Sequence, residues 1–87
     1  MTTLVWDDWN RGHIKKHKVS IEEVEEVWKD YSLIVESYLE RSMIFGRTKK
    51  GRLLTVVLSY LRQIRPYVVS ARDMSYKERK VYYEKTS

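Results

Sequence analysis

The sequence predicts an α+β domain in which helices pack on a small antiparallel sheet. In the first third of the chain, apolar side chains recur every three or four residues, which is the spacing of helices that bury one face. From Tyr31 the spacing changes to two, which is typical of strands. Ser75 and Glu78 then have the spacing of a capping box, which opens a last helix extending to about residue 84. Because 87 residues contain no linker or internal repeat, we expect a single domain over 1–87.

The chain opens with Leu4-Val5-Trp6, a short apolar segment that we expect to form a strand. Asp7 follows in the position of a helix N-cap, and the helix should end near Lys18. Three- and four-residue spacing places six residues on one face of this segment: Trp6, Trp9, Asn10, His13, Ile14 and His17. We expect the tryptophans to lie in the core.

A second helix begins after Ser20, which forms a capping box with Glu23. Its apolar stripe consists of Ile21, Val24, Val27 and Trp28. Four glutamates lie outside this stripe: Glu22, Glu23, Glu25 and Glu26. We expect these glutamates to form a solvated face.

Three segments after the helices have strand character: 33–35, 41–48 and 52–60. The last of these is apolar on both faces, which predicts a central strand. Lys49-Lys50-Gly51 forms the turn before it, with Gly51 supplying the positive φ that such turns need.

The fourth strand is expected over 67–72. Arg62-Gln63 forms the turn that precedes it, and Pro66 marks its start because proline cannot donate to a strand ladder. Strict alternation places Val68, Ser70 and Arg72 on one face, and Tyr67, Val69 and Ala71 on the other.

The charge of the chain is unevenly distributed. Residues 1–44 contain 6 Lys or Arg and 9 Asp or Glu, whereas residues 45–87 contain 11 and 3. The basic second half is an electrostatic pattern that favours nucleic-acid binding, although basic residues also serve solubility.

The absence of cysteine excludes disulfides and thiolate metal sites. No apolar run approaches the roughly 20 residues of a membrane span, and no signal peptide is visible, so we expect a cytoplasmic protein that binds no membrane.

Seven groups of residues occur in a fixed order along nearly the whole chain: Trp6-Asp7 with Asn10; His13-Ile14 with Lys16-His17; Val19-Ser20 before Glu22-Glu23; Gly46-Arg47-Thr48 before Gly51-Arg52-Leu53; Val56-Val57; Ser70-Ala71-Arg72-Asp73-Met74; and Glu78-Arg79 with Tyr82 or Tyr83. Together they resemble the BrnT-type toxins of bacterial toxin–antitoxin pairs. The sequence departs from that family at Lys18, where glycine tends to close the first helix, and at Pro66-Tyr67, where arginine often precedes the last strand.

The resemblance implies a RelE-like fold with a short N-terminal strand, two helices, a three- to four-stranded antiparallel sheet and a C-terminal helix. It also implies an endoribonuclease that cleaves cellular RNA and so inhibits translation. A small antitoxin with a ribbon-helix-helix DNA-binding portion would neutralise the toxin, and the complex would repress its own operon.

Cleavage of RNA by its 2′-OH requires in-line geometry, a base, an acid and cations around the crowded phosphate. Arginine suits the last role because its planar fork binds two phosphate oxygens and stays charged. Four arginines are candidates: Arg47, Arg52, Arg72 and Arg79. Two of them have an alternative to phosphate binding. Arg52 could simply flank a turn, and Arg79 could be an exposed helix residue.

His13 and His17, four residues apart on one helix face, are candidates for acid–base catalysis or RNA contact, with His17 the catalytic candidate. Packing beside the tryptophans is the alternative, and two ligands without a further His or Cys make a poor metal site. Glu78 is either a base or simply part of its capping box. We expect no cofactor and a reaction that does not depend on a metal.

Aromatic and lysine side chains supply the remaining candidates for RNA binding: Lys49, Lys50, Tyr76, Tyr82 and Tyr83. Core and rim positions beside the sheet are the alternative for the tyrosines. Two functions beside the toxin stay open. One is a non-catalytic RelE-like binding module, an orphan or adaptor that holds a protein partner and nucleic acid. The other is a homodimer formed through exposed sheet edges. Convergence of the arginines and a histidine on one face favours the enzyme, whereas scattered arginines favour the module.

Overall fold

The computed structural model describes residues 3–31, 33–36, 41–60 and 65–86. Its elements, in chain order, are α1 (Asp8–Lys16), α2 (Ile21–Lys29), β1 (Leu33–Glu36), β2 (Arg41–Arg47), β3 (Leu53–Ser59), β4 (Tyr67–Asp73) and α3 (Tyr76–Thr86). The strands form one antiparallel sheet in the order β1-β2-β3-β4. The predicted α+β class and the internal position of β3 are confirmed. The predicted turn at Arg62-Gln63 lies outside the described residues.

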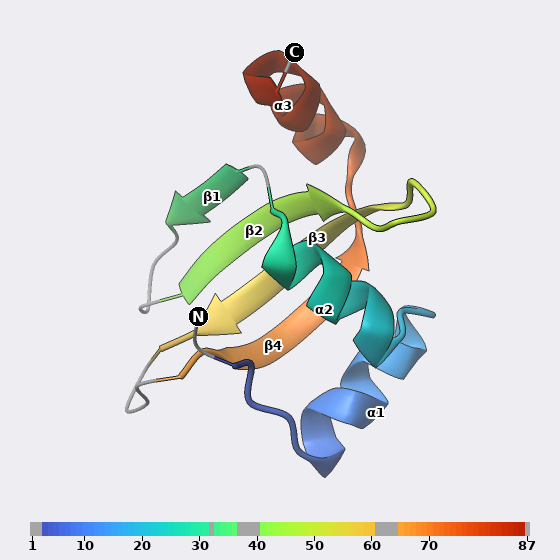
Figure 1. The fold of residues 1–87 in the computed structure, drawn as a ribbon, viewed down its shortest axis with the longest axis vertical. Helices are drawn as coiled ribbons and strands as arrows, with labels where there is room; N and C mark the ends of the chain where they lie inside the picture. Colours follow the sequence, from blue (N-terminus) through green and yellow to red (C-terminus); the bar gives the residue numbers. More distant parts are fainter. Residues whose placement is uncertain (1–2, 32, 37–40, 61–64, 87) are drawn as a thin grey trace.

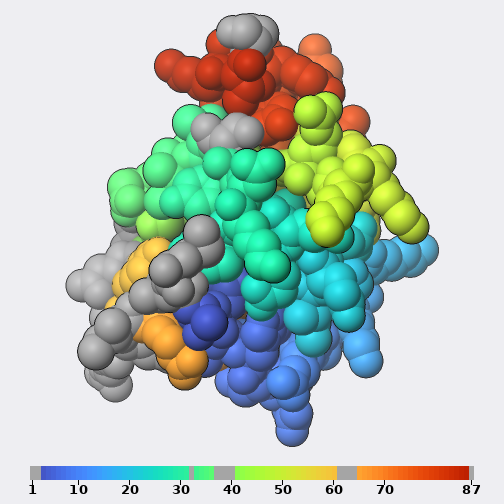
Figure 2. Space-filling model, viewed as in Figure 1, coloured from blue at the N-terminus to red at the C-terminus, as the bar shows by residue number. Residues whose placement is uncertain are grey.

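The helices lie at different places around the sheet (Figure 1). Helices α1 and α2 cover one face, whereas α3 follows β4 and lies beyond β1 and β2 at the opposite end of the molecule from α1. The space-filling view shows α1 and α3 at the two ends, with α2 and the β2–β3 turn on the surface between them (Figure 2). Helices α1 and α2 therefore pack on a different part of the sheet from α3.

Side-chain caps fix the helix starts as predicted. Asp7 accepts from the Asn10 backbone N–H at 2.9 Å, and the Asn10 side chain accepts in return from the Asp7 N–H at 2.8 Å. Ser20 and Glu23 form the predicted capping box, at 3.1 and 3.0 Å. Each of these boxes satisfies two backbone N–H groups that the helix leaves unpaired.

The first helix ends two residues earlier than predicted, at Lys16. The chain reverses at Lys18, which has a left-handed φ of +57°. The residue at which this sequence departs from the glycine typical of the family therefore has the backbone conformation that glycine adopts most easily.

The expected opening strand is reduced to one parallel bridge between Val5 and Tyr67. Asn10 explains why the segment does not continue along the sheet. This buried side chain donates to the carbonyl oxygens of Val5 and Val68, at 2.9 and 3.0 Å, and so ties the turn into α1 to β4.

The predicted alternation in β4 is wrong because the strand contains a bulge. Val57 pairs with Ser70 but the next residue, Leu58, pairs with Val68, which leaves Val69 as an extra residue. As a result Val68 and Ala71 both enter the core under α1 and α2. Arg72, which pairs with Thr55, thereby lies on the sheet face opposite to Val68.

Two apolar clusters stabilise the sheet. The larger lies between the sheet and the first two helices and includes Ile14, Val24, Val27, Trp28, Ile44, Leu54, Val56, Leu58, Val68 and Ala71. The smaller lies under α3 and consists of Phe45, Met74 and Tyr82, with Leu33, Val35, Met43 and Leu53 packed against them. The helix α3 is thus held by a small cluster.

Trp9 belongs to neither cluster and is 58% exposed, so the prediction that the tryptophans lie in the core is wrong for this residue. The reason is that Asn10 and Ile14 form the inward face of α1.

Candidate functional site

A two-pronged ion pair connects the sheet to α3. Arg72 Nη1 donates to Glu78 Oε1 at 2.5 Å, and Nη2 donates to Oε2 at 2.9 Å. Glu78 Oε1 also accepts from the Thr55 hydroxyl at 3.0 Å and from the Ser75 backbone N–H at 2.8 Å. Ser75 Oγ accepts in turn from the Glu78 N–H at 3.2 Å, which completes the predicted capping box. One carboxylate therefore orients Arg72 and caps α3.

The hydrogen bonds around Glu78 keep it ionised. Burial of its carboxyl disfavours the charge, but the donors Arg72, Ser75 and Thr55 outweigh burial and lower the pKa of Glu78 to about 2. The same hydrogen bonds, which Arg72 donates to Glu78, raise the pKa of Arg72. A carboxylate of such low basicity is a poor general base at neutral pH. Its geometry is that of a residue that positions Arg72.

Arg72 retains a free edge. An arginine carries five N–H groups in a planar fork. Two of them bind Glu78, and Nη1 also lies 3.4 Å from the Asp73 carbonyl oxygen. One N–H on Nε and one on Nη2 are left, and no residue in the described part of the chain accepts a hydrogen bond from them. These two N–H groups form the side edge of the fork, and the side chain of Arg72 is 35% exposed.

Arg52 forms a different cluster, on the side of the sheet that carries α1 and α2. Its Nε donates to Asp73 at 2.8 Å, and its Nη1 donates to Glu23 at 3.0 Å and to the Lys18 carbonyl at 2.7 Å. Nη2 lies 3.5 Å from the His17 carbonyl. The hydrogen bond from Arg52 is the main cause of the lowered pKa of Asp73. These contacts describe a clamp that fastens the α1–α2 turn to the end of the sheet.

The four candidate arginines all lie towards one end of the sheet, but they do not share one face. Arg47 ends β2 opposite Leu53, Arg52 precedes β3, and Arg72 lies near the end of β4. Arg79 is exposed in α3, and its charge contributes to the lowered pKa of Asp73, which places it near that carboxylate. The sequence did not point to Thr55 or Asp73, because their roles depend on partners 23 and 21 residues away in the chain.

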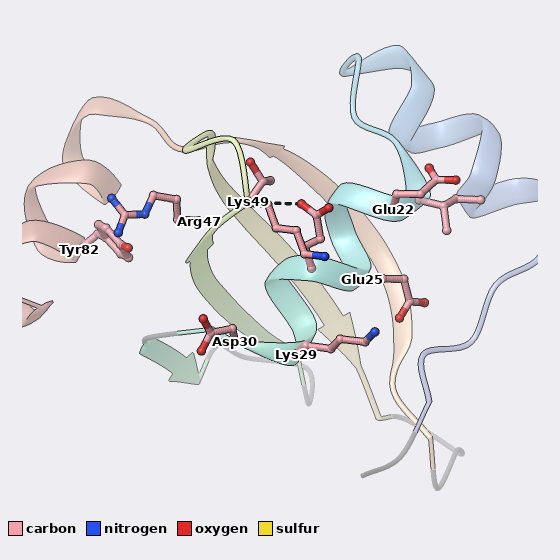
Figure 3. Close-up of a pocket in the computed structure, with 10 residues that line it drawn as sticks. Glu22, Glu25, Lys29, Asp30, Arg47, Lys49 and Tyr82 are labelled. Carbon is pink, nitrogen blue, oxygen red and sulfur yellow. Dashed lines mark hydrogen bonds between the residues drawn. The ribbon is translucent and has the colours of Figure 1, made fainter.

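Arg47 borders a cleft of about 530 Å³ between α2 and the β2–β3 turn (Figure 3). In Figure 3 its guanidinium lies beside Tyr82, and the dashed line marks the hydrogen bond from the Lys49 backbone N–H to Glu26, at 3.0 Å. The prediction that Glu26 belongs to a purely solvated face is therefore wrong, because its carboxylate accepts this hydrogen bond. Four acidic side chains line the cleft, Glu22, Glu25, Glu26 and Asp30, beside three basic ones, Lys29, Arg47 and Lys49. This mixture does not favour a polyanion inside the cleft. Lys50 is exposed in the adjacent turn.

The two histidines form an aromatic row with Trp9, in which His13 lies on α1 and His17 is the C-cap of that helix. Trp9 and His13 are stacked, with ring centroids 4.8 Å apart and an interplanar angle of 8°, and His13 meets His17 edge-on at 5.4 Å. The side chain of His17 is not brought to the Arg72–Glu78 pair, although its carbonyl contacts Arg52. The sequence did not reveal that Trp9 lies on the surface, because its position in the three- and four-residue helical spacing is also compatible with burial.

The tyrosines of α3 divide between core and surface. Tyr76 and Tyr83 are 84% and 57% exposed, whereas Tyr82 is buried and meets Tyr83 edge-on. Tyr82 is thus a core residue. Within the described residues, no three His, Asp or Glu side chains are gathered in a manner that could hold a metal ion. No helix in the same part of the chain is long and apolar enough to cross a membrane.

A comparison with protein families identifies the class of protein that this sheet, its flanking helices and its arginines represent. The model of the ribonuclease toxin BrnT, of type II toxin–antitoxin systems, matches residues 6–78. The chain therefore belongs to the BrnT family of ribonuclease toxins. Membership implies RNA as the substrate and an antitoxin protein as the partner. No curated protein and no solved structure matches the chain.

Proposed function

We propose that this chain is the toxin of a toxin–antitoxin pair and an endoribonuclease that cleaves cellular RNA, with the free edge of Arg72 as the centre of its site. The oriented fork of Arg72 carries this proposal. Glu78 and the Asp73 carbonyl hold the guanidinium in place, so the orientation of its remaining Nε and Nη2 N–H groups is fixed. Two parallel N–H donors at this spacing match two oxygens of a phosphate.

In the proposed reaction the 2′-hydroxyl of the RNA loses its proton and its oxygen attacks the adjacent phosphorus. The bond from phosphorus to the 5′-oxygen of the next nucleotide breaks, and that oxygen takes up a proton, so no net proton is consumed. The products are a 2′,3′-cyclic phosphate and a 5′-hydroxyl. Negative charge builds on the phosphoryl oxygens in the transition state, where an oriented arginine stabilises it most. Glu78 acts by positioning Arg72. The reaction needs no resident metal, because the cationic role falls to arginine.

The other candidates have supporting roles in this proposal. Arg79 and Arg47, with Lys49 and Lys50, attract the RNA backbone to the same end of the sheet, and Tyr76 and Tyr83 offer exposed rings for bases. Arg52 acts chiefly as the clamp described above. His17 lies at the C-terminal end of α1 rather than beside Arg72, which favours a contact with RNA over a direct proton transfer.

We further propose that cleavage takes place in the cytoplasm and inhibits translation, and that a small ribbon-helix-helix antitoxin neutralises the toxin. An acidic or amphipathic segment of such a partner would cover the basic end of the sheet and so exclude RNA. The test is titration with an acidic antitoxin-like peptide. Unchanged RNA binding in its presence would count against this mode of neutralisation.

The toxin proposal is tested by inducing the chain in a bacterial host and recording growth and bulk RNA integrity. The comparison uses Arg72→Ala and, as a matched control, Arg41→Ala, which removes an exposed arginine at the far end of β2 from Arg47. We expect growth arrest with RNA loss from the wild type and from Arg41→Ala, and neither from Arg72→Ala. A folded wild-type protein that causes no arrest would contradict the proposal.

One observation favours the alternative of a non-catalytic binding module. Arg52 and Arg72 are each engaged by carboxylates and lie on different faces, which is the scattered arrangement that this alternative predicts. A module, whether monomeric or a homodimer, would bind RNA or a protein partner without producing cleaved ends. Size-exclusion chromatography with light scattering separates the monomer from the dimer.

A further inference from the structure

One face of α1 is exposed and aromatic. Residues at positions i, i+3, i+4, i+7 and i+8 of a helix share a face, and here these positions are Trp9, Gly12, His13, Lys16 and His17. We call this set the α1 aromatic face. Trp9 is 58% exposed yet ordered by its stacking on His13, so a large apolar ring is presented to solvent in a fixed orientation. Single exposed apolar side chains are common, but a stacked pair that His17 extends edge-on is more specific.

Gly12 is the second observation. Glycine inside a helix costs about 1 kcal/mol relative to alanine, so it usually has a structural reason. None is present here. The backbone of Gly12 does not have a positive φ, and a Cβ atom at this position would meet no described atom within 4 Å other than its chain neighbours and the backbone of its own helix. Neither the turn geometry nor the packing of the described residues requires glycine. Its effect is to leave open space beside Trp9 and His13, where an external group can approach the helix closely.

The charges around the face favour a nucleic acid as the occupant. Lys15, Lys16 and Lys18 are all exposed at the C-terminal end of α1, next to His17. Aromatic rings flanked by cations are the arrangement with which proteins bind single strands, because every base has a flat face and every nucleotide carries a phosphate. A duplex keeps its bases stacked inside and cannot use such rings.

A continuous series of contacts joins this face to the Arg72 site. Trp9 stacks on His13, and His13 contacts His17. The His17 carbonyl accepts from Arg52, which pairs with Asp73. The Asp73 carbonyl in turn accepts from Arg72. These contacts connect the two sites around the end of the sheet, because Arg72 lies on the face opposite to Arg52.

We propose that the α1 aromatic face binds unpaired bases of RNA, with Trp9 and His13 as the stacking platform and Gly12 as the gap that admits the base. This subsite rests on the proposed function and deepens it, because it selects single-stranded substrate. Its position at the opposite end of the molecule from α3 makes it a separate contact from the site of cleavage (Figure 1).

The experiment measures equilibrium binding of a labelled, unstructured RNA about ten nucleotides long, 2′-O-methylated so that it cannot be cut through its 2′-oxygen. The full chain is compared with Trp9→Ala, Trp9→Phe and Gly12→Leu, and with Tyr60→Ala as a control that shortens an exposed aromatic at the other end of β3 from Leu53. Thermal unfolding verifies that each variant is folded.

Trp9→Ala should weaken binding of the single strand about ten-fold, and Trp9→Phe should restore most of it, since stacking survives. Gly12→Leu should also weaken binding without lowering the unfolding temperature. Tyr60→Ala should bind like the wild type, and an annealed duplex should bind more weakly than the single strand and ignore the Trp9 substitutions.

Equal affinity of Trp9→Ala and wild type for the single strand would overturn the subsite. If Trp9→Ala lost affinity for a protein antitoxin but not for RNA, the face would be assigned to that partner instead. Because the probe is uncleavable, these results are independent of catalysis. Failure of the wild type to cut unmodified RNA would instead contradict the proposed function and leave a Trp9-dependent binding site in place.

Discussion

Arg72 and Glu78 face each other across the junction of β4 and α3 and share two nearly parallel hydrogen bonds, Nη1–Oε1 at 2.5 Å and Nη2–Oε2 at 2.9 Å. The pair is only partly open to solvent, with side-chain exposures of 35% and 15%. Few other contacts hold α3 to the sheet, since Tyr82 is its one buried residue within the described range. The ion pair therefore links the stability of α3 to the orientation of the proposed catalytic arginine.

Glu78 should make the stability of the protein depend on pH. Its pKa is lowered from 4.5 to about 2 in the folded state, so the folded protein gains stability from the ionised carboxylate above pH 4.5. That gain is lost as the pH falls through this window towards the folded pKa. We expect Glu78→Gln to lower the free energy of unfolding by about 2 kcal/mol at pH 7, and by progressively less at lower pH.

Chemical denaturation from pH 7 down to pH 3 measures this difference between wild type and variant. Glu84→Gln, which changes an exposed glutamate of the same helix, is the matched control and should have no effect at any pH. A Glu78→Gln deficit that stayed constant across the range would contradict the assignment of the lowered pKa to this residue.

Arg52 should matter for stability more than its surface position suggests. Its three closest acceptors, Asp73, Glu23 and the Lys18 carbonyl, come from three different segments. Arg52→Ala should lower the free energy of unfolding by about 2 kcal/mol in chemical denaturation. Arg52→Lys should recover little, because one ammonium group cannot reach acceptors arranged around a planar fork.

Arg11→Ala provides the control for Arg52. Arg11 forms an ion pair with the fully exposed Asp8 at 3.8 Å, and such exposed pairs contribute little to stability. If both substitutions cost equally little, Arg52 is not a clamp, and its role as a direct RNA ligand would gain support.

Substitution of Lys18 by glycine should stabilise the folded protein. A left-handed φ of +57° strains any residue with a Cβ atom, and glycine adopts it without that penalty. We expect Lys18→Gly to raise the unfolding temperature by about 3 °C in a thermal melt, which for a domain of this size corresponds to roughly 0.5 kcal/mol. Arg11→Gly, in the middle of α1, should lower it instead, since glycine weakens a helix interior. A lower melting temperature for Lys18→Gly would show that its side chain supplies an interaction that outweighs the strain.

Features that depend on neighbours in the sequence were predictable, and those that depend on distant partners were not. Asp7 and Ser20 could be assigned as caps because their partners lie three residues away. Gly51 could be assigned to its turn because a positive φ favours glycine, and its φ is +91°. By contrast, the bulge at Val69 is set by pairing across β3 and β4, and no local signal in the sequence marks it.

The candidate site follows the same division. Sequence spacing pointed to the capping role of Glu78, but its pairing with Arg72 depends on the path of β4, and the bulge decides which face Arg72 occupies. The partners of Arg52 lie 21 to 34 residues away, so a residue that reads as the flank of a turn became a clamp. Trp9 and Asn10 are adjacent on a broad helix face, and only tertiary packing decides that Asn10 is buried and Trp9 exposed.

We propose that Arg72 stabilises the transition state of RNA cleavage by the 2′-oxygen, and cleavage of a labelled RNA by the purified protein tests this role directly. Wild type, Arg72→Ala, Arg72→Lys and the control Arg41→Ala would be compared, with thermal unfolding as the measure of folding. We expect 2′,3′-cyclic phosphate ends and no cleavage of 2′-O-methylated RNA. We also expect a loss of about 100-fold or more for Arg72→Ala, little rescue by lysine, and full activity for Arg41→Ala. Cleavage by folded Arg72→Ala at the wild-type rate would contradict this role.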